Sequence, residues 1–172
     1  ILLPRFLRCT EETLALSLAL EGKFIKPGPS GAPTRGRIDV LLTGRNFYSV
    51  DPRVIPTQTA WRCGQSLAED MIERYLKDFG KFPKTTALVI WATSNMPTGG
   101  DDIAQAMALW GCKPIWEPIS GRVVDFEIIP LSVLGRPRID VLMRVSGMFR
   151  DSFGEVISLL STIPKRLAEL DE

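Results

Sequence analysis

The sequence predicts an α/β fold in which a mainly parallel, Rossmann-like sheet is flanked by helices. Short apolar runs alternate with longer stretches whose apolar residues recur at three- and four-residue spacing, as in amphipathic helices. The run T-A-L-V-I-W-A, residues 86–92, is apolar throughout, which suits a strand covered on both faces. The richest polar stretches follow predicted strands and precede predicted helices, as ligand-binding loops do in open α/β sheets.

The chain is predicted to divide into an N-terminal helix with a linker, residues 1–36, and an α/β domain, residues 37–172. Thr10 is a suitable N-cap for a helix that reaches Leu20, because two glutamates follow it and favour the positive end of a helix. Residues 26–37, K-P-G-P-S-G-A-P-T-R-G-R, contain too many prolines and glycines for a regular element.

The α/β domain is predicted to begin with a strand at residues 38–42, which form a short apolar run. Thr57 then caps the clearest helix of the chain, which reaches about Phe79 and ends at Gly80. The next strand is residues 86–92. The remaining predicted elements are a helix from Ile103 to Trp110, strands at 114–117, 123–129 and 139–145, the second of these antiparallel or at an edge, and a helix from Ser152 to about Thr162 that Pro164 interrupts.

The charge balance gives no general reason to expect nucleic acid or an anionic membrane as a partner. The 172 residues carry 21 Lys and Arg against 20 Asp and Glu, a net charge of +1. No apolar run approaches the roughly 18 residues of a membrane-spanning helix, so no membrane span is expected. The chain begins Ile-Leu-Leu-Pro, without an initiator Met, which favours an excised fragment.

The chain contains no histidine, which excludes Ser-His-Asp, Cys-His and zinc-histidine sites built within it. Acid–base or metal chemistry must therefore use carboxylates, lysines, tyrosines or thiols. Three widely separated cysteines, Cys9, Cys63 and Cys112, are typical of reduced thiols in a cytoplasmic protein.

Three polar stretches, residues 43–51, 93–102 and 146–151, follow predicted strands. If these strands are parallel, the stretches meet at the carboxyl edge of one sheet. The competing interpretation is structural, since Asp and Asn before helices often serve as caps and glycines as turns. The residues expected at this edge are Arg45, Asn46, Tyr48, Asn95, Asp101, Asp102, Arg150 and Asp151.

The stretch T-G-G-D-D, residues 98–102, looks at first like a phosphate-binding turn before a helix. A phosphate loop usually brings a lysine, whereas this turn ends in two carboxylates that would repel a phosphate. There is no G-x-G-x-x-G either. We therefore expect no ATP binding by this chain, and a turn whose acceptors suit a cation, a protonated nitrogen or an arginine. Asp101 is the expected helix cap.

Five motifs, in order along the chain, resemble the CobN-type large subunit of aerobic cobaltochelatase and, more distantly, the magnesium chelatase H-subunit. They are P-G-P-S-G-A-P-T-R-G, T-G-R-N-F-Y-S-V-D-P, T-G-G-D-D-I-A-Q-A-M-A-L, G-R-P-R-I-D-V and S-G-M-F-R-D. The resemblance runs from about residue 2 to about residue 163. Leu42 departs from it, because the family usually has proline before T-G-R-N.

The resemblance implies that this chain is an internal fragment of a much longer subunit that binds a tetrapyrrole. In the cobalt enzyme, cobalt(II) is inserted into hydrogenobyrinic acid a,c-diamide, while ATP with magnesium is bound by separate AAA+ ATPase and adaptor subunits. The fragment alone is expected to be inactive. The alternatives are a magnesium chelatase H-type segment, a structural or subunit-docking segment without ligand contacts, and an unrelated nucleotide-dependent Rossmann-like enzyme.

Metal insertion needs anionic groups that accept the protons of the ring nitrogens, and the corrin periphery carries carboxylates and amides that suit arginine and amide partners. Asp101 and Asp102 are accordingly the predicted catalytic residues, with Asp51 and Asp151 as further carboxylates. Arg136 and Arg138 are either anchors or parts of a turn that pair with Asp140 or Asp151. The predicted substrate-binding residues are Arg45, Asn46, Tyr48, Asn95, Arg150 and Asp151, and no metal ligand is assigned.

Overall fold

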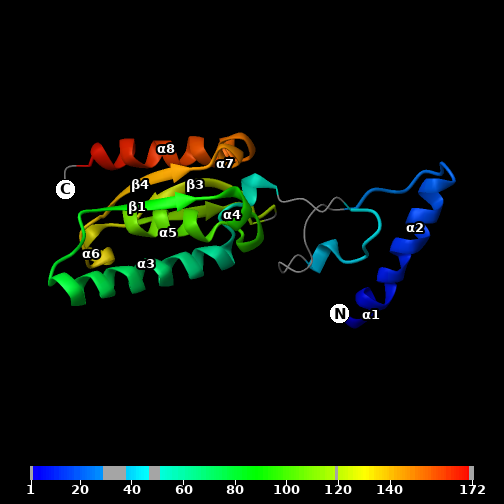
Figure 1. Ribbon diagram of the computed structural model, residues 1–172, viewed down its shortest axis with the longest axis horizontal. Helices are drawn as coiled ribbons and strands as arrows, with labels where there is room; N and C mark the ends of the chain where they lie inside the picture. The colour runs from blue at the N-terminus through cyan, green and yellow to red at the C-terminus, as the bar shows by residue number, and fades with distance from the viewer. Residues whose placement is uncertain (1, 29–37, 47–50, 119, 171–172) are drawn as a thin grey trace. The chain divides into compact units, whose positions relative to one another are not determined.

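The computed structural model describes residues 2–28, 38–46, 51–118 and 120–170 (Figure 1). The chain forms two compact units, Ile1–Asp51 and Pro52–Glu172. The predicted division between residues 36 and 37 falls inside the first unit and within residues 29–37, which lie outside the described part.

The described part of the first unit contains two α-helices, α1 (Leu2–Leu7) and α2 (Glu11–Leu20), joined by the 3-10 turn η1 (Arg8–Thr10). Thr10 occupies the predicted N-cap position, but the prediction that its side chain caps the helix is wrong. Its hydroxyl donates to the carbonyl of Leu7, 3.5 Å away, and accepts from no N–H of α2. The predicted helix is confirmed.

The predicted strand at residues 38–42 is wrong. Ile38–Val40 forms the 3-10 turn η3, and Leu42 has a φ of 85°, which is outside the extended region. Val40 and Leu41 are buried, so their apolar character reflects burial in a turn and not a place in a sheet. The left-handed backbone of Leu42 is also one that proline, with φ near −65°, does not adopt.

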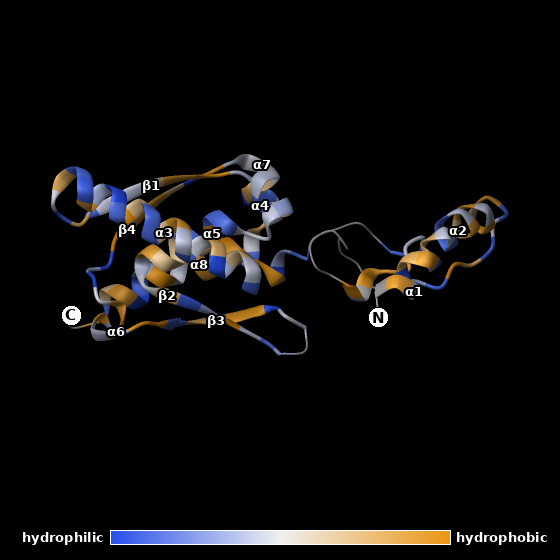
Figure 2. Cartoon of the chain, turned by 90° about the horizontal axis from the view of Figure 1, so that it is seen from below, coloured by the Kyte–Doolittle hydropathy of each residue, from blue (hydrophilic) through white to orange (hydrophobic). Residues whose placement is uncertain are grey.

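The second unit has three layers, with helices between a parallel and an antiparallel pair of strands (Figure 2). β1 (Thr85–Ile90) pairs in parallel with β4 (Asp140–Val145), which confirms the parallel pairing predicted for residues 86–92 and 139–145. β2 (Cys112–Trp116) pairs antiparallel with β3 (Val123–Ile128), as predicted for the latter. The helices of the middle layer are α3 (Gln58–Phe79), α5 (Asp101–Trp110) and α8 (Gly154–Ala168).

Helix α3 begins and ends where the sequence indicates. The Thr57 hydroxyl accepts a hydrogen bond from the N–H of Ala60 at 3.1 Å, and Gly80 ends the helix with a φ of 67°. Gly64 faces α5, where a Cβ at this position would lie 2.5 Å from the Cβ of Ala104. The two helices therefore approach closely because residue 64 has no side chain.

Helix α5 is the centre of the core. Seven of its ten residues, Ile103, Ala104, Ala106, Met107, Ala108, Leu109 and Trp110, are buried. It packs against α3, against β2 on one side and against β1 and β4 on the other. A helix surrounded in this way must be apolar nearly all round, so its polar residues are confined to its N-terminal turn and Gln105.

Several predicted loops form short helices. α4 (Ala92–Thr98) follows β1, and α7 (Gly147–Ser152) follows β4. The predicted interruption of the last helix is also wrong, because α8 continues through Pro164 to Ala168. Its buried stripe, Val156, Leu160 and Ile163, offsets the lost backbone hydrogen bond at the proline. The remaining short elements are η4 (Pro52–Val54) and α6 (Leu131–Leu134).

Candidate functional site

The carboxyl ends of β1 and β4 lie side by side, and a polar segment follows each of them. The N–H of Ser146, just after β4, donates to the carbonyl of Ile90, the last residue of β1, at 3.0 Å. The Ser146 hydroxyl then caps α7 by accepting from the N–H of Phe149 at 3.1 Å. Two of the three polar segments expected at this edge, residues 93–102 and 146–151, are therefore neighbours.

Asn95 is completely buried and holds Asp102 in place. Its amide nitrogen Nδ2 donates to Asp102 Oδ2 at 2.8 Å and to the carbonyl of Trp91 at 2.9 Å. The Ser94 hydroxyl also lies 3.3 Å from Asp102 Oδ2. Both hydrogen bonds that the described residues donate to Asp102 end on Oδ2, so the second carboxylate oxygen, Oδ1, is left for a further partner. The sequence predicted Asn95 at this edge as a substrate ligand, whereas its amide nitrogen binds a carboxylate of the protein.

Asp101 is the first residue of α5, and the prediction that it caps the helix is wrong. The N-cap is Gly100, and the Thr98 hydroxyl accepts instead, from the N–H groups of Gly100 at 3.4 Å and Asp101 at 3.3 Å. Asp101 approaches the thiol of Cys63 on α3. Partial burial raises the pKa of Asp101, the thiol hydrogen bond lowers it, and the charge of Asp102 raises it further. The charge of Asp101 in turn raises the pKa of Cys63.

Arg150 and Asp151 lie on α7 and form an ion pair with each other. The Arg150 Nε to Asp151 Oδ1 distance is 2.9 Å, and 71% and 66% of the two side chains are exposed. This hydrogen bond raises the pKa of Arg150 above its ordinary value. Because an exposed ion pair of this kind contributes little to stability, both side chains can exchange this contact for another partner at little cost.

Arg45 and Asn46 belong to the first unit. The carbonyl of Arg45 accepts from the N–H of Gly28 at 2.7 Å, and Arg45 Nε is buried with no hydrogen-bond partner among the described residues. Asn46 lines a cavity of about 660 Å³ beside α2. Tyr48 lies outside the described residues. The prediction that residues 43–51 follow a strand of the same sheet is wrong, because no strand precedes them in the described part of the first unit.

Arg136 and Arg138 bind backbone carbonyls at the C-terminal end of α5. Arg136 donates to the carbonyls of Ala108 at 2.6 Å and Leu109 at 3.2 Å. Arg138 donates to the carbonyls of Trp110, Gly111 and Ile129 at 3.1, 3.2 and 2.9 Å. Burial lowers the pKa of Arg136. From the sequence we expected carboxylates as the partners of these arginines. The carbonyl groups at the end of α5 were not among the predicted partners.

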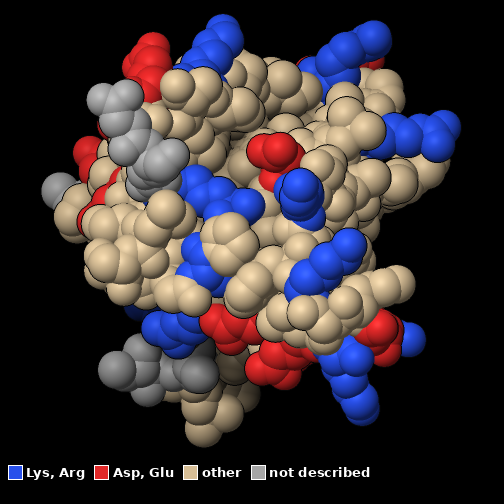
Figure 3. Space-filling model, turned by 90° about the vertical axis from the view of Figure 1, so that its left-hand side faces the viewer, with Lys and Arg blue, Asp and Glu red and all other residues tan. Residues whose placement is uncertain are grey.

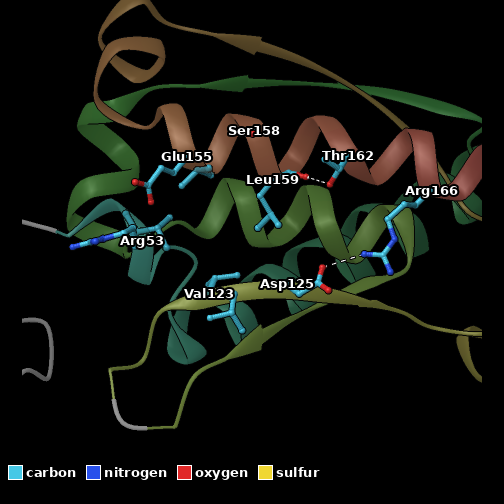
Figure 4. A pocket seen from close by; sticks show the side chains of 11 residues that line it. Arg53, Val123, Asp125, Glu155, Ser158, Leu159, Thr162 and Arg166 are labelled. Atoms are coloured by element: carbon cyan, nitrogen blue, oxygen red, sulfur yellow. Dashed lines mark hydrogen bonds and ion pairs between the residues drawn. The ribbon is translucent and has the colours of Figure 1, made fainter.

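A groove of about 500 Å³ lies between α8, β3 and η4, and sequence reasoning did not single out its polar residues (Figure 4). Arg53 and Glu155 stand at one end, and Arg166 bonds Asp125 at 3.1 Å at the other. The Arg166 guanidinium also lies 4.4 Å from the centre of the Phe126 ring. In sequence these are isolated surface charges, and no spacing links them.

The described residues hold no cluster of three or more His, Cys, Asp or Glu side chains that could bind a metal ion. Cys112 is buried, which raises its pKa to about 11, so this thiol stays protonated at neutral pH. In the same described part, every helix is too short or too polar to cross a bilayer.

Comparison with known proteins identifies the family. All residues, 1–172, match the family described as CobN/Magnesium Chelatase. The chain belongs to the CobN/magnesium chelatase family. It is 57% identical to the aerobic cobaltochelatase subunit CobN of Sinorhizobium sp over 149 residues, and 55% identical to that of Pseudomonas aeruginosa over 157 residues. Identity to the chloroplastic magnesium-chelatase subunit ChlH of Oryza sativa subsp. japonica is 43% over 159 residues.

A solved structure supports the same relationship. The catalytic subunit of cobaltochelatase from Mycobacterium tuberculosis is 46% identical, with a TM-score of 0.76 over 99% of this chain. The match spans 15% of that chain, and 12% and 13% of the two CobN relatives. This chain therefore corresponds to a small part of these family members and shares their α/β fold there.

Proposed function

We propose that this chain is the tetrapyrrole-binding section of a cobaltochelatase large subunit, at which cobalt(II) enters hydrogenobyrinic acid a,c-diamide. The observation that carries the proposal is the Asn95–Asp102 arrangement at the carboxyl edge of β1 and β4. Cobalt rather than magnesium is favoured by the identity of 57% to a cobaltochelatase subunit, against 43% to a magnesium chelatase subunit. In this proposal ATP is hydrolysed by partner ATPase subunits, because the turn before α5 carries carboxylates where a phosphate loop usually has a lysine.

Metal insertion requires the N–H group of the corrin ring to lose its proton as the nitrogen–cobalt bonds form. Asp102 is suited to accept such a proton, because hydrogen bonds fix its Oδ2 while Oδ1 remains available. Asp101 is one residue away, so the pair supplies two acceptors at the N-terminus of α5, the positive end of the helix dipole. Cobalt(II) is the substrate of this step, and the neighbouring carboxylates lower the cost of bringing a dication to the ring.

Arg150 and Asp151 are the proposed peripheral contacts on the same edge. Their pair is exposed and weak, so a carboxylate or amide of the tetrapyrrole can replace Asp151 as the partner of Arg150. Arg45, Asn46 and Tyr48 remain proposed ligands from the first unit. Arg45 fits this role because its Nε is buried and has no hydrogen-bond acceptor among the described residues, so a ligand acceptor would satisfy it.

The test is Asp102→Asn in the full-length large subunit, assayed with its ATPase subunits. We expect cobalt insertion to slow by about tenfold or more, the low end of the contribution of a positioned acid or base. Tetrapyrrole binding, measured by fluorescence quenching, and the melting temperature should change little, because asparagine still accepts from Asn95. Glu127→Gln, at an exposed residue of β3, is the matched control and should leave all three unchanged. Normal insertion by Asp102→Asn with loss of stability would make Asp102 a structural residue.

A further inference from the structure

The outer face of the β1–β4 pair is apolar and uncovered within the second unit. Parallel partners in register project their side chains to the same face, so Ala87 lies beside Leu142 and Val89 beside Arg144. Val89, Trp91 and Leu142 are 52%, 57% and 67% exposed. The opposite face packs on the helical layer, as the contact of the Thr86 hydroxyl with Met71 Sδ of α3, 3.8 Å away, illustrates. In Figure 2, α5 and α8 lie on the side of this strand pair that faces β2 and β3.

Exposure of this kind is unusual for parallel strands. Parallel sheets are almost always covered on both faces, because the helices that connect their strands pack there. Here the whole connection between β1 and β4 contributes α4, α5, β2, β3 and α6. Its helix α5 packs on the inner face. Whatever covers the outer face of β1 and β4 must therefore come from outside residues 52–172.

We propose that a helical segment of the same long polypeptide, from outside the second unit, covers the face formed by Ala87, Val89, Trp91 and Leu142. The full-length relatives support this occupant, because the matched region is only 12% to 15% of their chains and most of each polypeptide lies elsewhere. A permanent neighbour also fits the composition. Large side chains at the centre of the face would favour aggregation if they met water whenever a transient partner left.

We expect the covering segment to be a helix with one apolar stripe that faces the β1–β4 pair. Arg144 is the one charged residue in the middle of the face, opposite Val89, and Asp140 and Thr85 lie at the end where the strands begin. The covering helix should therefore place a carboxylate or a carbonyl over Arg144 and aliphatic side chains over Leu142 and Val89.

Cysteine labelling of the purified full-length subunit, without its ATPase partners, tests the proposal. Leu142→Cys and Val89→Cys should react with a maleimide at least tenfold more slowly in the native subunit than in urea. Lys77→Cys, on the exposed side of α3, is the control and should react rapidly in both conditions. Modified residues are identified by peptide mass spectrometry, because Cys63 is also exposed.

Three results would overturn the proposal. Native labelling of both positions as fast as that of Lys77→Cys would show that the subunit leaves this face open. Protection that appears only after the ATPase subunits are added would assign the face to a partner protein. Protection that disappears on dilution to the monomer would assign it to a second copy. A variant that fails to fold is recognised by its melting curve, and the other position then decides.

Discussion

The two ends of helix α5 both carry charges that complement the helix dipole, yet they are used differently. At the C-terminal end, Arg136 and Arg138 donate to the last carbonyls of the helix, and Arg138 also donates to the carbonyl of Ile129, just after β3. At the N-terminal end, Asp101 and Asp102 cap no N–H of the helix, and hydrogen bonds from α4 hold one oxygen of Asp102. At the C-terminal end the arginine side chains are bound to backbone carbonyls. At the N-terminal end the carboxylate oxygens can still accept hydrogen bonds from a ligand.

This difference indicates which charges of a buried helix are structural. Arg138 donates to three carbonyls, so its removal would deprive the carbonyls of Trp110 and Ile129 of this donor. Asp102 binds side chains of the flanking helix and not the backbone of its own helix. The outer surface at the arginine end shows basic and acidic side chains interspersed, with no single-sign patch (Figure 3). We therefore place the proposed chemistry at the carboxylate end.

The largest effect is expected from Arg138→Ala. A hydrogen bond to a charged group contributes ~1.5–3 kcal/mol, and the loss of three carbonyl contacts should lower the free energy of unfolding by roughly 3 kcal/mol. Chemical denaturation of the full-length subunit measures this, with Arg74→Ala on the exposed side of α3 as the control. If Arg138→Ala unfolds like its control but loses tetrapyrrole affinity, this end of α5 binds ligand and the comparison fails.

Arg150→Lys and Arg45→Lys should weaken tetrapyrrole binding by roughly tenfold, as expected for the loss of one charged hydrogen bond of ~1.5 kcal/mol. Lysine keeps the charge but lacks the planar fork that matches a carboxylate. Fluorescence quenching of the full-length subunit gives the affinity, and Arg74→Lys serves as the control. Unchanged affinity for both variants, with a shift in melting temperature alone, would make the two arginines structural.

Thr98→Ala tests how the carboxylate end of α5 is capped. The Thr98 hydroxyl accepts from the N–H groups of Gly100 and Asp101 at 3.4 and 3.3 Å, which are long hydrogen bonds. Its loss should cost ~0.5–1 kcal/mol of unfolding free energy, at the lower end for a capping residue. Thr98→Ser should restore the stability because the hydroxyl remains. If Asp101→Asn lowers the free energy of unfolding more than Thr98→Ala does, Asp101 and not Thr98 caps the helix.

The smallest effect is expected at Cys63, whose thiol reports the charge of Asp101. That charge raises the pKa of Cys63, so less thiolate is present at pH 8 than in an ordinary cysteine. Asp101→Asn removes the charge, lowers the pKa of the thiol and should speed its alkylation by iodoacetamide at pH 8. The two rates should converge at a pH well above both pKa values. Equal rates at pH 8 would show that the two groups do not interact.

The sequence by itself determined the elements whose signals are local. Thr57 and Gly80 mark the ends of α3, and short runs rich in apolar residues mark β1 and β4. The five ordered motifs indicated the chelatase family before any geometry was available, and the polar segments after β1 and β4 were correctly expected to meet. Caps, apolar periodicity and strand order act over short stretches, so a sequence records them directly.

The tertiary structure decided what depends on contacts between distant residues. The run at 38–42 has strand composition but no strand neighbour, so it forms a turn. Pro164 stays inside α8 because packing on one face outweighs a lost hydrogen bond. Arg138 lies 27 or 28 residues from the two carbonyls it binds at the end of α5, and Asn95 lies seven from Asp102. A charged or amide side chain can reach several kinds of partner, and only the fold selects which one lies within hydrogen-bonding distance.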